Sequence, residues 1–352
     1  MMKTITVSVS KTYDIFVGSG LLGKSGGIIS QVCPGLSAAI VTDSTVDSLY
    51  GGRLADILAK SGLRVSKYVF PQGEESKNPE IFLSILNFLA QEKITRADAV
   101  VALGGGVAGD LAGFAAASYM RGAGFIQIPT TLLAAVDSSV GGKTGINLPS
   151  GKNLAGAFYQ PDAVICDTSL LSTLDPEVFK DGCAEVIKYG MIADRTLLKG
   201  VEMPGRGSLE DVIARCVSIK RDIVAGDELE RGERRMLNFG HTVGHAVELL
   251  SGYQISHGRA VAIGMATITR ATVKMGLCRS DCLDDLLESL DRHSLPQSTS
   301  YNACQLARAC LSDKKRGRDG LVMVFPVEPG KCELKKIPVS DLEQVIRLGL
   351  EG

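Results

Sequence analysis

The sequence predicts an α/β fold in which a mostly parallel sheet is followed by an α-helical domain. The first half alternates short apolar runs with helical segments, which is typical of a parallel sheet covered on both faces. After about residue 168, almost every segment has the apolar spacing of a helix. The chain has 352 residues, which is long for one hydrophobic core. We therefore expect two domains, 1–168 and 169–352, with the boundary between 165 and 175.

The first half contains a signal for each expected strand and helix. The opening MMKTITVSVS alternates polar and apolar residues, which predicts a half-buried strand and not the apolar core of a signal peptide. Short apolar runs predict further strands at 38–43, 65–70, 98–106, 125–129 and 163–167. Apolar or small residues at helical spacing predict helices at 81–93 and 110–120.

The second half is dominated by helical patterns. Helices are expected at 177–198, 209–226, 233–250, 258–275, 281–292 and 338–350. Only LVMVFPVE, residues 321–328, has the character of a strand. This change of pattern is the reason for placing the domain boundary near residue 168.

The composition excludes several classes of partner. Hydrophobic residues make up 45%, charged residues 22%, and the net charge is −1. Such a balance provides no global attraction for nucleic acid or a membrane surface, and no apolar run is long enough to span a bilayer. Nine cysteines without CxxC pairing indicate reduced thiols that act as small buried hydrophobes. We expect a cytoplasmic protein.

A glycine loop follows the strand expected at 98–106. Residues Gly104–Gly109 match G-x-G-x-x-G between a strand and a helix, where backbone N–H groups and a helix N-terminus can face a diphosphate. No acidic residue follows at the usual ribose distance. Asp43 ends an earlier strand, and Glu74 and Lys77 follow another. The pattern favours a Rossmann-like nucleotide-binding domain over tight turns without a ligand.

Three of the four histidines lie in one short stretch of the second half. His241 and His245 are four residues apart, so they share one helix face, and His257 precedes another helix. A His/His/carboxylate set with Glu185 suits Zn²⁺. The spacing alone leaves a core or capping pair of histidines equally open. HTVGH lacks the glutamate of HExxH, since Thr242 stands there, which argues against a zinc peptidase.

Two lysines of the second half call for separate interpretations. Glu185 and Lys188 are three residues apart, which fits a solvated surface pair. Lys220 has apolar helical neighbours, and a lysine on such a face is usually buried for a reason, such as an anionic ligand.

Taken together, these segments resemble the 3-dehydroquinate synthase family of the sugar phosphate cyclase superfamily, over nearly the whole chain. The motifs that carry the resemblance are VTDSTVDSLY, GEESK, GGGVAGDLAGFAAASYMRG, IPTTLLAAVDSSVGGKTGINLPSGKN, GCAEVIKYG, LNFGHTVGHAVE, ISHGRAVAIGM and DKKRGRDG. DSSVGGKTGIN discriminates best, because sister cyclases typically carry a different sequence there. Metal-dependent polyol dehydrogenases are similar in fold and glycine loop but lack the lysine-rich set.

The resemblance implies a role for each site residue. The implied metal ligands are Glu185, His241 and His257. The implied NAD contacts are Asp43, Gly73, Glu74, Lys77, Gly105, Gly106, Val107, Ala108, Gly109, Asp110, Thr130, Thr131, Lys143, Lys152, Asn153, Leu170, Thr173 and Leu174. The residues implied around the substrate are Arg121, Asp137, Lys143, Lys188, Lys220, Arg234, Asn238, His245 and Lys314. His245 would be a substrate or proton-relay residue, and Arg121 would reach the substrate phosphate from the partner subunit of a homodimer.

The reaction implied is that of a phosphate-eliminating lyase of the shikimate pathway, which leads to chorismate and the aromatic amino acids. It converts 3-deoxy-D-arabino-heptulosonate 7-phosphate to 3-dehydroquinate and phosphate by transient oxidation, elimination, reduction and intramolecular aldol closure. NAD would be catalytic, with Zn²⁺ or Co²⁺ as the metal. A sister cyclase, a polyol dehydrogenase and a non-catalytic nucleotide-binding module remain as alternatives. One segment departs from the family: TLDPEVF has Glu177 and Val178 where TLPxRE is common, near the adenosine-side contacts.

Overall fold

The fold is described from a computed structural model, which covers residues 2–199, 209–312 and 320–351. The chain divides into two compact units, each with its own core. The first unit comprises residues 1–174 and 203–228, and the second comprises 175–202 and 229–352. The first segment of this unit thus ends within the expected boundary region, 165–175, and the unit also takes in a segment that we expected in the helical domain.

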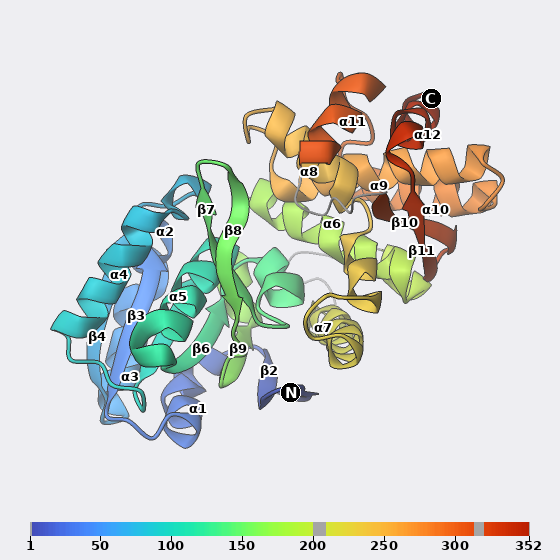
Figure 1. The fold of residues 1–352 in the computed structure, drawn as a ribbon. Coiled ribbons are helices and arrows are strands. Elements are labelled where there is room, and N and C mark those ends of the chain that lie inside the picture. The colour runs from blue at the N-terminus through green and yellow to red at the C-terminus, as the bar shows by residue number, and fades with distance from the viewer. Residues whose placement is uncertain (1, 200–208, 313–319, 352) are drawn as a thin grey trace. The chain divides into compact units, whose positions relative to one another are not determined.

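A seven-stranded sheet forms the centre of the first unit, among the residues that the structure describes (Figure 1). The strands are β1 (Lys3–Ser8), β2 (Thr12–Gly18), β3 (Ser37–Asp43), β4 (Arg64–Phe70), β5 (Ala99–Gly104), β6 (Gly124–Pro129) and β9 (Ala163–Asp167). Their order is β1-β2-β9-β6-β5-β3-β4. Only the β1–β2 pair is antiparallel, and the other pairs in this sheet are parallel. The expected parallel sheet is confirmed, and β2 is an additional strand.

Helices cover both faces of this sheet because its central strands are apolar on both sides. In β3, Ala38 and Ile40 face one core and Ala39 and Val41 face the other. The helices of the first unit are α1 (Ser25–Val32), α2 (Ser44–Val46), α3 (Gly52–Lys60), α4 (Pro79–Gln91), α5 (Gly106–Ser118) and α7 (Leu209–Gly226). Helices α1 and α3 contribute to the first core, and α4 and α5 to the second.

The strand order reverses direction between β3 and β5. The chain passes from β3 outward to β4 and then returns to place β5 on the other side of β3. In open parallel sheets, ligands bind at the carboxyl ends of the strands at such a switch point. Asp43 ends β3, and Gly104 ends β5. The fold therefore places the expected glycine loop and the expected acidic residue at the same edge.

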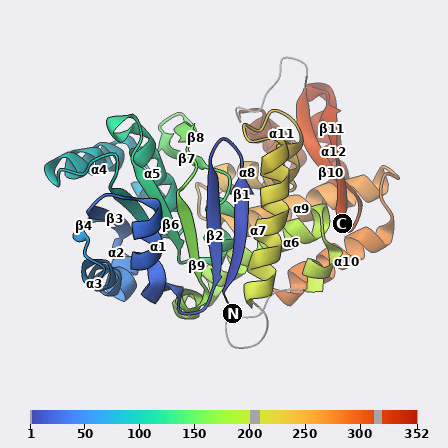
Figure 2. The same ribbon diagram turned by 90° about the horizontal axis from the view of Figure 1, so that it is seen from below.

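Two further features of the first unit were not foreseen from sequence. The antiparallel hairpin of β7 (Lys143–Leu148) and β8 (Gly151–Phe158) occupies the segment that was recognised only as a family motif. Helix α7, predicted correctly as a helix, packs against β1 and β2 and against the short helical turn η5 (Ala134–Ser138), all in the first unit (Figure 2).

The second unit is mainly helical, as expected. Its helices are α6 (Pro176–Ile192), α8 (His241–Leu250), α9 (His257–Lys274), α10 (Ser280–Arg292), α11 (Ala303–Ser312) and α12 (Val339–Leu350). The predicted strand at 321–328 is confirmed as β10 (Leu321–Glu328). It pairs with β11 (Lys331–Ile337), so the expectation of a single strand here was wrong. β11 is largely charged, which hides its strand character.

One expected helix, 233–250, was also wrong as a single element. It consists of the short helix η8 (Glu233–Asn238) and of α8, with a break at Gly240. Gly240 has φ +77°, and a Cβ there would lie 2.5 Å from Met265 Cγ. A side chain at this position would be strained and crowded, so glycine permits the break that makes His241 the first residue of α8.

Among the helices that the structure describes, none is both long and apolar enough to cross a membrane. All nine cysteines are free, as the scattered spacing predicted.

Candidate functional site

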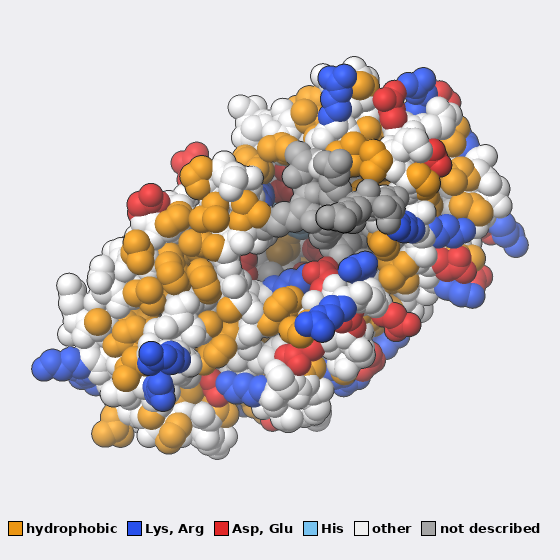
Figure 3. All heavy atoms as spheres, in the orientation of Figure 1, with side chains coloured by type: hydrophobic (Ala, Val, Ile, Leu, Met, Phe, Trp, Pro, Cys, Tyr) orange, Lys and Arg blue, Asp and Glu red, His pale blue; other side chains and the backbone are white. Residues whose placement is uncertain are grey.

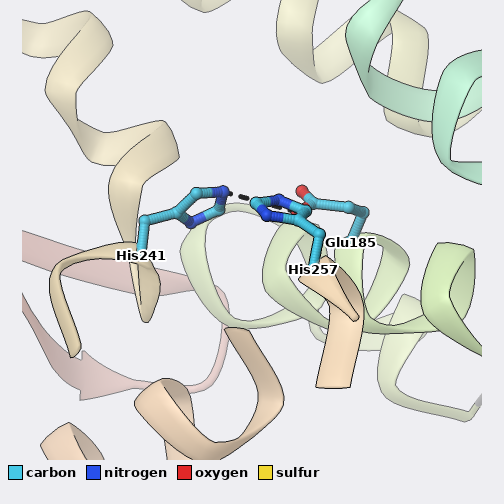
Figure 4. A group of neighbouring side chains, drawn as sticks. All are labelled: Glu185, His241 and His257. Atoms are coloured by element: carbon cyan, nitrogen blue, oxygen red, sulfur yellow. Dashed lines mark ion pairs between the residues drawn. The ribbon is translucent and has the colours of Figure 1, made fainter. Parts of the chain in front are cut away.

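Three helices of the second unit bring Glu185, His241 and His257 together (Figure 4). Glu185 lies in the middle of α6, and the two histidines are the first residues of α8 and α9. The Glu185 side chain is buried, with 1% exposed, whereas His257 remains 34% exposed. The buried carboxylate therefore has a partly accessible histidine beside it.

The distances within this cluster fit a divalent metal. His241 Nε2 and His257 Nε2 each lie 3.4 Å from the same atom, Glu185 Oε1. Zinc bonds of about 2.0–2.1 Å in tetrahedral geometry place neighbouring ligand atoms roughly 3.3–3.4 Å apart. Glu185 Oε1 is buried and accepts no well-aligned hydrogen bond. A cation held by these atoms would satisfy the carboxylate, so the residues present fit the metal that the sequence led us to expect.

His241 is oriented by the backbone. Its Nδ1 lies 3.0 Å from the carbonyl oxygen of Phe239. Because a carbonyl only accepts, Nδ1 carries the proton and Nε2 presents its lone pair toward Glu185. A ring nitrogen held in this way is the usual outer support of a metal-binding histidine.

Lys188 forms a buried ion pair with Glu185. The Lys188 Nζ lies 2.5 Å from Glu185 Oε2, both side chains are 1% exposed, and the Nζ also lies 4.6 Å from the Tyr189 ring centroid. A solvated surface pair, the simplest interpretation of this spacing, was therefore wrong. The lysine leaves Oε1 as the carboxylate atom that faces the histidines.

Burial and charged neighbours shift the pKa values of all three side chains of the cluster. Burial works against the charged form of Glu185, but Lys188 and His241 hold the pKa of this carboxyl well below its ordinary value. Burial lowers the pKa of His241 to about 4. Burial also disfavours charge on His257, but the neighbouring carboxylates of Glu185 and Glu248 outweigh this effect and raise its pKa to about 10.

Close helix packing positions the two histidines. A Cβ on Gly264 would lie 1.9 Å from the carbonyl oxygen of Gly240, and one on Gly244 would lie 3.0 Å from that of Ala260. Only glycine lets α8 and α9 approach this closely. The backbones that carry His241 and His257 are thus in direct contact.

Arg234, Asn238 and His245 were also expected around the substrate. They lie close to His241 in the sequence and differ in how far they are buried. Arg234, in η8, is buried with 1% exposed. Asn238 donates from Nδ2 to Glu230 Oε1 at 2.8 Å, and Glu230 has a left-handed φ of 57°. The His245 ring centroid lies 5.5 Å from that of His241. Lys314 lies outside the described residues.

In the first unit, the glycine loop opens α5 at the switch point. Gly105 is the N-cap and offers no side chain to the N–H groups of the first turn. These groups can therefore donate to an anion, as at many helix N-termini that bind phosphate. A Cβ on Gly104 would lie 2.6 Å from Ala108 Cβ and 3.6 Å from Asp43 Oδ2. The loop is tight, and the Asp43 carboxylate lies beside it.

Two threonines after β6 complete this edge. The Thr130 N–H donates to the Gly104 carbonyl at 3.0 Å, and a Cβ on Gly105 would lie 3.0 Å from Thr131 Cγ2. The expected contacts Gly106, Val107, Ala108 and Gly109 all lie in the first turns of α5. The structure therefore brings together Asp43, the glycine loop and both threonines.

A polar network joins the loop after β4 to the β7–β8 hairpin. Lys77 is ion-paired with Asp110, and its Nζ lies 2.6 Å from Asn153 Oδ1. Asn147 donates from Nδ2 to Glu74 Oε1 at 2.8 Å. Burial raises the pKa of Asp110, against the opposing pull of Lys77. Glu74, Lys77, Asp110 and Asn153 thus form one connected group.

Six further expected NAD contacts lie outside the glycine loop and this polar network. The Tyr50 hydroxyl donates to the Leu170 carbonyl at 2.9 Å and lies 2.6 Å from Thr173 Oγ1. Leu170 and Thr173 lie in the turn η6 (Thr168–Thr173) that follows β9, and Leu174 comes directly after it. Gly73 precedes the turn of Glu74 with φ +112°. Lys143 and Lys152 belong to the β7–β8 hairpin, where Lys143 is exposed.

Lys220 has an acidic partner within the first unit. Its Nζ donates to the Asp137 carbonyl at 2.8 Å and lies 2.9 Å from Asp137 Oδ2. The Lys220 side chain is 7% exposed and that of Asp137 is 22% exposed. The predicted burial of this lysine is confirmed. Both residues were expected around the substrate, and the structure places them in contact. Arg121, also expected there, is exposed after α5 with a left-handed φ of 63°.

Two acidic residues near the histidines were missed from the sequence. Glu248, on α8, lies 3.5 Å from His257 Nδ1 through its Oε2. Asp181, on α6, accepts from Ser256 Oγ at 2.6 Å, just before His257. Glu248 follows His245 by three residues on the same helix, which was a usable signal, whereas the Asp181–Ser256 contact depends on tertiary packing.

Solved structures of sugar phosphate cyclases are similar to this chain. A 2-deoxy-scyllo-inosose synthase, complexed with carbaglucose-6-phosphate, NAD⁺ and Co²⁺, matches with a TM-score of 0.87 and 27% identity over 99% of this chain and 100% of its own. ValA, the 2-epi-5-epi-valiolone synthase from Streptomyces hygroscopicus subsp. jinggangensis 5008 with NAD⁺ and Zn²⁺ bound, matches with a TM-score of 0.86 and 28% identity over 99% of both chains. An iron-containing alcohol dehydrogenase, at 16% identity and a TM-score of 0.67 over 99% of both chains, shares the fold alone.

Family profiles and curated relatives are more specific. The 3-dehydroquinate synthase N-terminal profile matches residues 67–181, and the C-terminal profile matches residues 182–316. The 3-dehydroquinate synthase of Streptococcus gordonii is 40% identical over 95% of this chain and 97% of its own. That of Clostridium botulinum is 41% identical over 96% and 99%. On this evidence, the chain belongs to the 3-dehydroquinate synthase family.

Proposed function

We propose that this chain converts 3-deoxy-D-arabino-heptulosonate 7-phosphate to 3-dehydroquinate and phosphate, as a lyase that uses NAD catalytically. The observation that carries the proposal is the buried Glu185 carboxylate, which has two histidine nitrogens at 3.4 Å from one of its oxygens. The family assignment supports the same reaction, since the 3-dehydroquinate synthases share 38–41% identity with this chain and the two sister cyclases only 27–28%.

We assign the metal to Glu185, His241 and His257 and NAD to the switch-point edge of the first unit. When bound, the metal would polarise adjacent hydroxyls of the substrate, and NAD would accept a hydride and return it. The first-turn N–H groups of α5 would hold the NAD diphosphate, and Asp43 would accept from a ribose hydroxyl. Lys77, fixed by Asp110 and Asn153, would add positive charge near the diphosphate.

Lysine and arginine side chains would hold the two anionic groups of the substrate. A carboxylate and a phosphate both favour charge-assisted hydrogen bonds, and arginine can bind either with two parallel bonds. We propose this role for Lys143, Lys188, Lys220, Arg234 and Arg121, and for Lys314, with Asp137 and Asn238 as polar contacts. His245, on the same helix face as the ligand His241, would relay a proton or bind the substrate.

We also propose that the protein is a cytoplasmic homodimer. Figure 3 shows hydrophobic side chains gathered over the first unit, around α4, α5 and the β7–β8 hairpin. Leu83 on α4 is 57% exposed and Phe158 on β8 is 44% exposed. A large apolar surface of this kind is typical of an interface, and Arg121 lies close by in sequence, after α5. Sedimentation of the full chain tests the dimer against the mass of one chain, 37.2 kDa. The nine free cysteines suit a reducing compartment.

Lys220→Met is expected to separate catalysis from folding. Methionine keeps most of the packing of the stem and removes the charge. Turnover should fall on the order of 10²–10³-fold, as when one electrostatic contact to a reacting group is lost. The melting temperature should fall by only a few degrees, since the lost pair with Asp137 is worth about 1–3 kcal/mol. Steady-state kinetics and a thermal melt measure both.

Lys3→Met is the matched control for this variant. Lys3 also pairs an element of the first unit with α7, through Asp211, but both side chains are exposed. It should change neither turnover nor melting temperature appreciably. A Lys220→Met protein that melts early yet turns over normally at low temperature would show that Lys220 is structural.

A substrate screen that follows phosphate release tests the proposed reaction. The full chain, with NAD⁺ and Co²⁺ or Zn²⁺ added, should release phosphate from the heptulosonate phosphate and not from glucose 6-phosphate or sedoheptulose 7-phosphate. Both control sugars lack the substrate carboxylate. Faster release from either of them would identify a sister cyclase instead.

A further inference from the structure

Glu248 lies on the same face of α8 as two histidines of the cluster. It follows His241 by seven residues and His245 by three, and both spacings return to the same side of a helix. Its side chain is 3% exposed, and Oε2 lies 3.5 Å from His257 Nδ1. The opposite ring nitrogen of His257, Nε2, faces Glu185 Oε1 at 3.4 Å. Glu248 therefore lies behind His257, on the side away from Glu185.

The backbone of His257 is already held by other contacts. Ser256 donates from Oγ to Asp181 at 2.6 Å, and the Arg259 N–H donates to the same carboxylate at 3.2 Å. A Cβ on Gly258 would lie 2.2 Å from the Asp181 carbonyl oxygen, so the start of α9 is pressed against α6. With the backbone held, the remaining freedom of His257 is the rotation of its ring and the choice of nitrogen that carries the proton.

We propose that Glu248 is a positioning residue that fixes the ring of His257 for metal binding. Its carboxylate accepts the Nδ1–H of His257 and so leaves the Nε2 lone pair directed at the metal. His241 receives the equivalent support from a neutral group, the Phe239 carbonyl. The two histidines thus differ, because the carboxylate behind His257 makes that ring the more basic ligand. This inference rests on the metal site proposed above.

A second arrangement uses the same residues. His245, Glu248 and His257 also lie close enough to hold a cation, through the other nitrogen of His257. In that arrangement Glu248 would be a ligand and not a support. The buried position of Glu248 and the two 3.4 Å distances to Glu185 Oε1 favour the first arrangement, in which one oxygen faces both histidines.

The test measures metal affinity without catalysis. The full chain is stripped with a chelator, and its affinity for Zn²⁺ is measured by competition with a chromophoric chelator, together with the absorption spectrum of bound Co²⁺. Glu248→Met keeps a side chain of similar length without an acceptor and should weaken affinity about 10–100-fold while one metal per chain still binds. Glu248→Gln keeps an acceptor and loses the charge, so its affinity should lie between those of wild type and Glu248→Met.

The matched control is the same pair of substitutions at Glu288, on α10, whose side chain is 73% exposed. These should leave affinity and the Co²⁺ spectrum unchanged. Unchanged affinity in Glu248→Met would overturn the proposal. Complete loss of the metal in both Glu248 variants would also overturn it, because Glu248 would then be a ligand. If Glu248→Met does not fold, an unchanged affinity in Glu248→Gln counts against the proposal. Full metal binding by His241→Ala would instead refute the metal site itself.

Discussion

His257→Ala is expected to release the metal and abolish turnover together. The substitution removes one of the two proposed nitrogen ligands and leaves a carboxylate and a single imidazole, which is a poor set for Zn²⁺. The loss in affinity should exceed the roughly 10–100-fold expected for an outer support. Elemental analysis of the purified variant should find far less than one metal per chain, and phosphate release should fall to background.

His293→Ala is the control for this prediction, since His293 lies outside the stretch that contains the other three histidines, just after α10. It should keep the metal and the activity. Thermal melts of both variants without metal should agree to within a few degrees, because His257 is partly exposed and leaves no large cavity. Full metal content in His257→Ala would discard the ligand set Glu185, His241 and His257.

The parallel sheet could be predicted because its signals are local. The runs that became β3, β5 and β9 are buried, apart from Asp43 at the end of β3, and such continuous apolar runs are typical of strands covered on both faces. Elements whose character depends on a partner were missed. β11 is charged and is a strand because it pairs with β10, and β2 is placed by its pairing with β1 and β9.

The division into units could be predicted only in part. Helix α7 has a clear apolar pattern, but no local pattern says which core it joins. Its position follows from tertiary contacts such as that between Lys220 and Asp137, which are 83 residues apart. The break before His241 also depends on tertiary contacts, because Met265 lies so close to residue 240 that only glycine fits there.

For the candidate site, sequence motifs identified the residue types, whereas the fold determines how these residues are arranged. The spacing of His241 and His245 left open whether both histidines bind a metal, and only the packing of α6, α8 and α9 brings Glu185, His241 and His257 together. The burial of the Glu185–Lys188 pair could not be predicted either, because its spacing is that of an ordinary surface pair. Asp43 and the glycine loop were expected at the same edge, and the strand order places them there.

We propose that NAD⁺ is required for the reaction but not consumed by it. We propose for this chain both a nucleotide-binding edge, with Asp43 and the Gly104–Gly109 loop, and a metal site with basic residues suited to an anionic substrate. A simple dehydrogenase would not need basic residues for an anionic substrate. An elimination without oxidation would not need the nucleotide-binding edge. Having both suggests that oxidation serves to acidify a neighbouring C–H bond and is later reversed.

The direct measurement follows phosphate and NADH in the same reaction. Full-length protein with its metal, a small amount of NAD⁺ and an excess of the heptulosonate phosphate is incubated, and phosphate release and the NADH absorbance are recorded together. We expect many molecules of phosphate per molecule of NAD⁺, no phosphate when NAD⁺ is omitted from protein freed of nucleotide, and a flat NADH signal. Accumulation of NADH mole for mole with product would contradict the catalytic use of NAD⁺ and identify a polyol dehydrogenase.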